Sequence, residues 1–368
     1  MTESTERVTT AELLDLAKSS VATARTLEYW RQEGLLPKAK RTGQTGKRPE
    51  WTYPAEAADQ LTALLRLREK TKQPDVLRVA LWFEGFPIDT VRVRASIAAE
   101  LRRLHEFVTN EVDEHRGRSA AGEGSTWVAL EEIGRLWARK RGSNAPPRYG
   151  RQTLDDRARA MTLILGLALG DNGASSRLEE DAHRVEWLIG ADRGRHSRAG
   201  LPTLLKGTPG EGLADFASFA SLPALIETIE SATEDEVAAS RMLARLMLDG
   251  ITGFARIVDA FTVIENVFGL AAMETFRDDP NAAVWLTAFV IAVGRSRELS
   301  ENLRSLLDAL SRDVLPVAER ARELAVLSAE DLHQQLPALE NLPFIERVRI
   351  QGLISKYRDE QPHVEPSH

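Results

Sequence analysis

Positively charged side chains gather in one short stretch near the beginning of the chain. Between Lys38 and Arg48 there are five lysines and arginines, two glycines and no aspartate or glutamate. Segments of this kind bind nucleic acids, because each cation that reaches a phosphate releases condensed counterions. Arg25 and Arg31 lie shortly before the stretch and add two guanidinium groups. The chemistry that this region can perform is therefore the binding of a polyanion.

A short helix is predicted to position the two upstream arginines. Thr23 is suited to cap its first turn, since a threonine hydroxyl accepts hydrogen bonds from free backbone N–H groups. Gly34 is placed to end the helix, and Pro37 prevents a restart nearby. Leu27 and Trp30 are three residues apart and should face a neighbouring helix. The opposite side of the helix is then left to solvent or to a ligand.

The neighbouring helix is predicted to begin near residue 9 and to run to about Lys18. Thr9 and Glu12 have the spacing of a capping box, in which each residue satisfies a backbone N–H group of the other. Two capped helices followed by a basic, glycine-bearing hairpin are the layout of a winged helix-turn-helix. In such a unit the second helix enters the major groove of DNA and the wing contacts phosphates.

The same region resembles the MerR family of transcription regulators. The resemblance covers roughly residues 8 to 70, and it rests on the order and spacing of Asp15-Leu16-Ala17, Arg25-Thr26-Leu27-Glu28-Tyr29-Trp30, Glu33-Gly34-Leu35-Leu36-Pro37, Tyr53 and Leu61. The family usually has a glycine in place of Val21, an arginine in place of Glu28 and a tyrosine in place of Trp30, and a shorter wing. The resemblance implies a homodimer that binds a pseudo-palindromic operator. Family members often lie between promoter elements and distort the DNA so that RNA polymerase can engage it.

On this interpretation one set of residues is predicted to contact double-stranded DNA. Arg25 should meet a base edge or a phosphate, with Thr23 and Thr26 next to it at the helix N-terminus. Glu28 repels phosphate, and Arg31, one turn further on, is placed to compensate. The residues expected on phosphates are Tyr29, Arg31, Lys40, Arg41, Lys47 and Arg48. Packing is the alternative role for Tyr29. Lys38 and Tyr53 complete the predicted DNA-binding set.

Charge is distributed unevenly along the 368 residues. The net charge is −7, yet the stretch from Lys18 to Lys72 has a balance of +6, which leaves −13 for the rest. This asymmetry indicates a basic reader attached to an acidic body. The chain has no cysteine, which excludes disulfides, thiolate metal sites and cysteine nucleophiles. Its longest apolar runs are about half the length that a membrane span requires. We expect a cytoplasmic, nucleoid-associated protein.

The predicted fold class is mainly α: a winged helix-turn-helix with a small β-hairpin wing, followed by an all-α body. The predicted divisions are 1–75 for the DNA-binding domain, 76–116 for connecting helices, 117–125 for a linker, 126–360 for the all-α domain and 361–368 for a disordered tail. In the body we expect helices over Val128–Arg141, Leu154–Leu169, Glu234–Leu248 and Gly253–Phe276, among others.

One helix between the reader and the body has coiled-coil spacing. Ile97, Leu101, Leu104 and Val108 follow one another at intervals of four, three and four residues. In the MerR family such a helix pairs two subunits. A helix packed on its own domain has the same spacing, and two heptads do not decide between the two interpretations.

The acidic body offers two weaker patterns. Phe261 and Phe268 belong to an aromatic stripe that also contains Glu265. The stripe is typical of a core, and a cavity there would hold a cationic aromatic ligand. Glu180/His183 and Glu330/His333 have the Glu-x-x-His spacing of di-iron bundles, which is also the pattern of an exposed helix face. We expect neither a metal nor another cofactor.

Several function classes remain for comparison. The chain has no phosphate loop, dinucleotide-binding glycine motif, nucleophile elbow or zinc-protease motif, so we do not expect an enzyme. The leading hypothesis is a dimeric transcription regulator whose body answers a small-molecule or protein effector. In the first alternative the body is a protein-interaction module, or an enzyme without a familiar motif, tethered to DNA. In the second the protein is an architectural factor of the phage or plasmid type.

Overall fold

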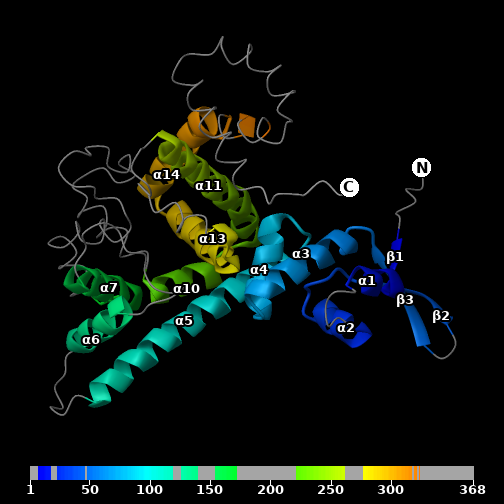
Figure 1. Cartoon of the computed structure of the whole chain (residues 1–368), viewed down its shortest axis with the longest axis horizontal. Helices are drawn as coiled ribbons and strands as arrows, with labels where there is room; N and C mark the ends of the chain where they lie inside the picture. The colour runs from blue at the N-terminus through cyan, green and yellow to red at the C-terminus, as the bar shows by residue number, and fades with distance from the viewer. Residues whose placement is uncertain are drawn as a thin grey trace, which may run out of the picture. The chain divides into compact units, whose positions relative to one another are not determined.

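A computed structural model describes residues 7–17, 23–45, 48–118, 126–139, 154–171, 221–261, 277–316, 319, 320 and 323. This part of the chain is mainly helical and contains one small antiparallel sheet, as predicted (Figure 1). The elements are β1 (Arg7–Thr9), α1 (Thr10–Leu16), α2 (Ala24–Gln32), β2 (Lys40–Thr45), β3 (Arg48–Pro54), α3 (Ala57–Lys70), α4 (Pro74–Glu84), α5 (Thr90–Arg118), α6 (Thr126–Arg139), α7 (Leu154–Leu169), α10 (Leu222–Glu230), α11 (Glu234–Phe261), α13 (Pro280–Arg295), α14 (Arg297–Ala309) and a π-helical turn (Leu310–Val314). None of the helices in these ranges is long and apolar enough to span a membrane.

The chain divides into two compact units that do not follow the order of the sequence. The first unit contains the residues up to Glu106 together with Leu222–Met242 and Asp278–Ala292. The second contains Phe107–Ser221, Leu243–Arg277 and the residues from Val293 onward. Two segments that lie far downstream thus share a unit with the basic N-terminal region. The linker predicted over 117–125 begins inside a helix, because α5 continues to Arg118.

Helices α1 and α2 form where the local capping signals place them. At the start of α1 the Thr9 N–H donates to Glu12 Oε2 at 2.7 Å, and the Glu12 N–H donates to Thr9 Oγ1 at 3.3 Å. At the start of α2 the Thr26 N–H donates to Thr23 Oγ1 at 3.2 Å. Helix α2 ends at Gln32, and Gly34 follows it with a φ of 70°, a left-handed conformation that favours glycine. The capping box and both predicted ends of α2 are confirmed.

The core around α2 comes from three helices. Leu13 of α1, Leu27 and Trp30 of α2, and Leu61 and Leu64 of α3 are almost completely buried. The side-chain amide of the buried Gln60 donates to the backbone carbonyl of Leu35 at 3.0 Å, which ties α3 to the segment after α2. One face of α2 is therefore packed against the core, and this packing determines which residues of α2 lie on its exposed face.

The sheet has the order β1–β3–β2, with both pairs antiparallel. The β2–β3 pairing is interrupted between Arg41 and Gly43, where β2 holds one residue more than β3. Pro54 closes β3, and α3 begins only at Ala57. A proline is compatible with this strand end, because no ladder N–H is needed there.

Helix α5 buries most of the stripe with coiled-coil spacing. Ile97, Leu101 and Val108 are at most 3% exposed within a single chain, while Leu104 is partly exposed. The stripe is thus covered by the chain's own residues, and it does not provide a free surface for a second subunit. Of the two interpretations that the spacing left open, this burial favours a helix packed on its own chain.

In the second unit, helices α6 and α7 approach each other closely. A Cβ added at Gly134 of α6 would lie 2.7 Å from the backbone carbonyl oxygen of Ala158 and even nearer to the hydroxyl of Thr162. Thr162 itself is buried and donates to the Ala158 carbonyl at 2.8 Å. Gly134 is therefore a contact point between two helix backbones. The match of α7 to the predicted range Leu154–Leu169 is complete.

Helix α11 is longer than predicted, and the packing of Gly250 explains the difference. The sequence analysis expected one helix to end near Leu248 and another to begin at Gly253, but α11 runs without a break to Phe261. Gly250 lies within it, and an added Cβ there would be 2.7 Å from a methyl carbon of Leu310. The glycine that resembles a helix breaker in the sequence is thus a close packing point. The predicted tail, 361–368, lies outside the described residues.

Candidate nucleic-acid interface

The two faces of α2 differ sharply in exposure. Leu27 and Trp30 are buried, whereas Thr23, Arg25 and Tyr29 are exposed, Tyr29 to 46%. The packing role that was the alternative for Tyr29 does not fit this exposure. Arg25 and Tyr29 are four residues apart, so their side chains lie on one side of the helix. The exposed face thus carries a guanidinium group and a phenol next to each other.

The first turn of α2 is the positive end of the helix dipole. Its free N–H groups and the dipole both favour an anion at this position. The Thr23 hydroxyl is engaged in the cap, and it lies 2.9 Å from the Thr26 hydroxyl. Arg25 is the second residue after the cap and forms no ion pair with any residue in the described part of the chain. This end of α2 is suited to a phosphate or another anion.

Glu28 is neutralised within α2. Arg31 Nε donates to Glu28 Oε2 at 2.8 Å, and the Gln32 amide donates to Glu28 Oε1 at 2.9 Å. The hydrogen bond from Arg31 holds the pKa of Glu28 below its usual value and raises the pKa of Arg31. The Arg31 guanidinium also lies 5.5 Å from the ring centre of Trp51 on β3. Arg31 therefore compensates for Glu28 directly, and the pair has no net charge.

The predicted basic residues of the hairpin have different surroundings. Lys38, Lys40 and Arg41 are exposed, the last two on β2. Lys47 lies outside the described residues, and so does the side chain of Arg48, whose backbone begins β3. Exposed cations thus follow α2 directly in the chain and continue along an edge of the sheet.

Tyr53 requires a correction to the predicted DNA-binding set. It is 3% exposed, and this burial raises the pKa of its phenol. It lies in β3, the middle strand of the sheet and one of the two strands of the hairpin. Because its side chain is covered, Tyr53 leaves the set of candidate contacts.

Two arginines that the sequence analysis did not select hold the other end of α2. Arg78 of α4 donates to the Glu33 carbonyl oxygen through Nε at 3.0 Å and Nη2 at 2.7 Å. Arg92 of α5 donates to the Gln32 carbonyl oxygen at 3.1 Å. Positive charge at a helix C-terminus is stabilising. Arg78 is the only charged residue between Val76 and Phe83, an apolar run, and that isolation was the available signal.

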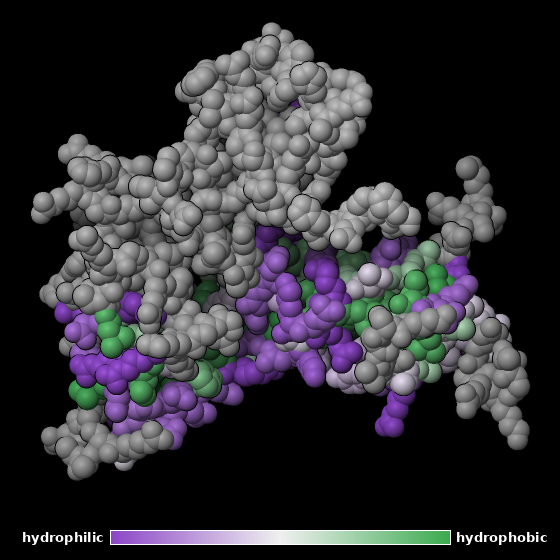
Figure 2. Space-filling view, viewed as in Figure 1, coloured by the Kyte–Doolittle hydropathy of each residue, from purple (hydrophilic) through white to green (hydrophobic). Residues whose placement is uncertain are grey.

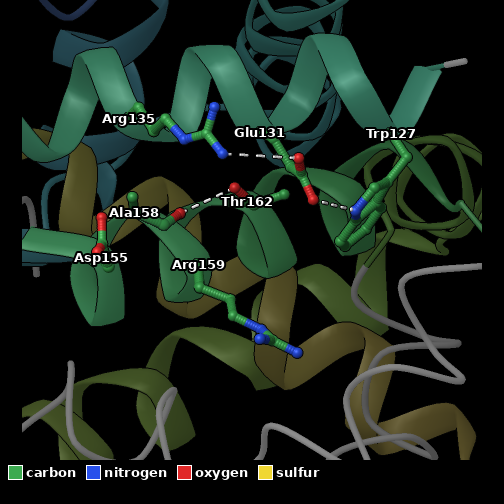
Figure 3. Close-up of a pocket in the computed structure, with 7 residues that line it drawn as sticks. All are labelled: Trp127, Glu131, Arg135, Asp155, Ala158, Arg159 and Thr162. Atoms are coloured by element: carbon green, nitrogen blue, oxygen red, sulfur yellow. Dashed lines mark hydrogen bonds and ion pairs between the residues drawn. The ribbon is translucent and has the colours of Figure 1, made fainter.

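A polar groove between α6 and α7 is a second candidate site (Figure 3). It has a volume of about 450 Å³. On α6 the Trp127 indole N–H donates to Glu131 at 2.9 Å, and Arg135 lies 3.9 Å from the same carboxylate. Asp155 and Arg159 lie on α7. Two carboxylates and two guanidinium groups balance here, so the groove is suited to small polar molecules and not to a polyanion.

The predicted ligand residues of the body fall mostly outside the described chain. Phe261 is the last residue of α11, and only its backbone is described, while Glu265 and Phe268 lie beyond it. The two Glu-x-x-His pairs also lie outside the described ranges. Within those ranges no three histidine, aspartate or glutamate side chains come together in a way that could hold a metal ion.

The chain was compared with known proteins in three ways. A scan against protein-family models, a search of curated proteins and a search of solved structures each find no match.

Proposed function

We propose that this chain is a sequence-specific DNA-binding transcription regulator whose reader is a MerR-like winged helix-turn-helix. In this proposal α1 and α2 are the helix-turn-helix, and the β2–β3 hairpin is the wing. The packing of α2 supports this assignment, because Leu27 and Trp30 anchor one face and leave the other free for a groove. The antiparallel pairing of β2 with β3 supports the wing.

One observation carries the proposal. Arg25 and Tyr29 share the exposed face of a capped helix, and the acid between them in the sequence, Glu28, is bound by Arg31 and Gln32. A helix that presents an arginine near its N-terminus, without a competing carboxylate, is suited to reading guanine or holding a phosphate. We assign base readout or a phosphate contact to Arg25, and phosphate contacts to Tyr29 and the threonines of the first turn.

The wing supplies sequence-independent affinity in this proposal. Lys38, Lys40 and Arg41 are exposed and add three positive charges within a few residues of α2. Lys47 and Arg48 belong to the same basic segment by sequence. Cations on a hairpin contact the phosphates that flank a major groove, and these contacts fix register and orientation.

The remaining parts of the proposal follow from the resemblance. The regulator acts as a homodimer on a pseudo-palindromic operator in the nucleoid, and it adjusts the access of RNA polymerase. The helical body has no catalytic role and receives a small-molecule or protein effector. The burial of the coiled-coil stripe means that a dimer has to use another surface. A tethered interaction module and an architectural factor are the alternatives that operator mapping distinguishes.

Selection of bound duplexes from a random DNA library tests the proposal. We expect one enriched pseudo-palindromic sequence. Arg25→Ala should relax the preference at one position of each half-site, whereas Lys47→Ala with Arg48→Ala should weaken binding to all sequences alike. The double variant should also flatten the dependence of affinity on salt by about one unit of slope for each lost phosphate contact. Arg297→Ala, which removes a charge from α14, is the matched control. A wild-type chain that enriches no sequence contradicts the proposal.

A further inference from the structure

The first turns of α5 hold other parts of the chain on two opposite sides. Successive residues of a helix are rotated by about 100°, so Arg92 and Arg94 point about 200° apart. Arg92 and Ser96 lie on one side, Thr90 and Arg94 lie on the other, and Arg102 lies about 80° around the helix from Arg94. Both sets contact segments of the first compact unit. Figure 1 shows α5 with α4 and α2 toward one end and α10 alongside it, and Figure 2 shows hydrophilic side chains along its visible surface.

The first side of α5 positions the C-terminus of α2. Arg92 Nη1 donates to the Gln32 carbonyl oxygen at 3.1 Å, and it would be 2.7 Å from a Cβ at Gly34. Ser96 Oγ donates to Asp75 at 3.0 Å and accepts a hydrogen bond from Arg78. Arg78 in turn binds the Glu33 carbonyl oxygen. Four hydrogen-bonded side chains thus connect α5 to the last turn of the helix that we propose as the DNA reader.

The second side of α5 holds the corner between α10 and α11, residues 230–234. Arg102 Nε donates to Glu230 Oε1 at 3.0 Å, and Thr90 Oγ1 donates to Glu234 Oε2 at 3.0 Å. Between them Arg94 donates to the backbone carbonyl of Ala232, a residue with no exposed surface. These contacts join positions that are 128 to 144 residues apart in the chain.

The α10–α11 corner is itself well defined. The Thr233 N–H donates to Glu236 Oε2 at 2.7 Å, and the Glu236 N–H donates to Thr233 Oγ1 at 3.2 Å. This reciprocal capping box fixes the direction in which α11 leaves the corner. A displacement of α11 would therefore move the corner as well, because the capping box limits the flexibility of the backbone between them.

We propose that the α10–α11 corner, by its contacts with α5, sets how firmly α2 is held for DNA binding. Arg92 and Arg94 are about 3 Å apart along the axis of one rigid helix, so a displacement of one moves the other. When the corner leaves α5, the hold of Arg92 and Ser96 on the end of α2 loosens. DNA binding then weakens, because the reader has to be ordered as it binds. A conformational change at the α10–α11 corner is thus transmitted through α5 to α2. The expected effect on DNA binding rests on the proposed function.

Reversal of the charges at Arg102 and Glu230 tests the link. Arg102→Glu removes positive charge and Glu230→Arg adds it, so simple attraction to DNA predicts opposite effects of the two variants. If the pair instead holds the α10–α11 corner on α5, both variants should change the affinity for DNA in the same direction. We expect each single variant to weaken binding to the selected operator by up to about fivefold, the upper range for an exposed ion pair. The double variant, in which the pair is restored with exchanged charges, should recover wild-type affinity. Arg116→Glu, near the far end of α5, is the charge-matched control and should have a smaller effect.

A second measurement does not depend on DNA. The amides of Leu35 and Leu36 both bond to the Trp30 carbonyl at the end of α2, so their hydrogen exchange reports on the hold of that end. Exchange of these amides should accelerate in both single variants and return to the wild-type rate in the double variant, with an unchanged midpoint of thermal unfolding. Opposite effects of the two reversals on affinity, or exchange rates that do not change, would overturn the inference. If the wild type selects no operator but the exchange pattern appears, the proposed function fails and the mechanical link stands.

Discussion

The exposed face of α2 and the groove between α6 and α7 contain similar side chains, but they differ in the balance of positive and negative charge. Each presents arginines and an aromatic ring from a helix. In the groove, Glu131 and Asp155 balance Arg135 and Arg159. On α2 the carboxylate of Glu28 is paired with Arg31, and Arg25, Lys40 and Arg41 form no ion pairs in the part of the chain that the structure describes. Uncompensated charge, and not the amount of charge, therefore distinguishes a surface suited to a polyanion.

The two regions also differ in how their helices are held. Helices α6 and α7 meet at Gly134 with backbone close to backbone. Helix α2 is instead fixed at its end by side chains from α4 and α5. A backbone contact is rigid, whereas long arginine side chains can release their partners.

Removal of Arg78 should have the largest effect on stability. Its side chain is 10% exposed and binds Asp75 as well as the end of α2. Arg78→Ala leaves a partly buried carbonyl and a partly buried carboxylate without this donor, and we expect a loss of about 3 kcal/mol in the free energy of unfolding. Urea denaturation measures it. Arg66→Ala breaks an exposed pair with Glu84 and should cost less than about 1 kcal/mol. Equal losses in the two variants would refute a special role for Arg78.

The close contact of α6 and α7 should be sensitive to one added methyl group. Gly134→Ala forces the two backbones apart, and we expect it to lower the free energy of unfolding by about 2 kcal/mol. The same substitution at Gly294 of α13, where nothing lies within 4 Å, should raise stability by up to about 1 kcal/mol because alanine is the better helix former. Opposite signs in urea denaturation support the packing argument, and a neutral Gly134→Ala would contradict it.

Uncompensated and compensated arginines should contribute differently to DNA affinity. Arg25→Ala is expected to weaken operator binding by about tenfold or more, since a specific base contact is worth about 1–3 kcal/mol. Arg135→Ala removes the same charge from the balanced groove and should change affinity by less than about twofold. Fluorescence anisotropy with a labelled operator measures both variants. Similar effects of the two would mean that net charge alone governs binding.

Release of Arg31 from Glu28 should give the smallest change in the affinity for operator DNA, and this change should be an increase. Glu28→Gln removes the carboxylate that holds Arg31, and we expect affinity to rise by about threefold and the salt slope to steepen by about one unit. Because the folded-state pKa of Glu28 is lowered, its contribution to stability is present above its unfolded pKa and is lost as the pH falls through the folded value. The variant should therefore lose part of the acid sensitivity of unfolding below about pH 4. An unchanged salt slope would show that Arg31 remains away from phosphate.

Features governed by neighbouring residues could be predicted from the sequence. The capping box of Thr9 and Glu12, the cap at Thr23 and the left-handed Gly34 depend on hydrogen bonds or backbone conformations that span at most a few residues. The exposed face of α2 followed from the same local pattern, because the spacing of Leu27 and Trp30 assigns the buried side. The basic hairpin followed from its cations and glycines.

Features that depend on distant partners could not be predicted. Arg78 and Arg92 meet the end of α2 across 45 and 60 residues, and Arg102 meets Glu230 across 128. Nothing in the spacing of Ile97, Leu101 and Val108 shows whether the same chain or a second one covers them, since both kinds of packing require the same period. Arg31 was predicted to contact phosphate in place of Glu28, whereas its ion pair with Glu28 depends on side-chain geometry that the order of residues does not contain.

The irregularity between Arg41 and Gly43 has a consequence for colloidal behaviour. Strand β2 is an edge of the sheet, so one row of its backbone groups faces away from β3 and could pair with another molecule. A bulge and closely spaced lysine and arginine side chains are the features that discourage such edge-to-edge association. The cations proposed to hold phosphates thus also keep separate molecules apart when no DNA is present. A chain with a neutral hairpin would lose both the phosphate contacts and the protection against self-association. Self-association would be most pronounced in the absence of its operator.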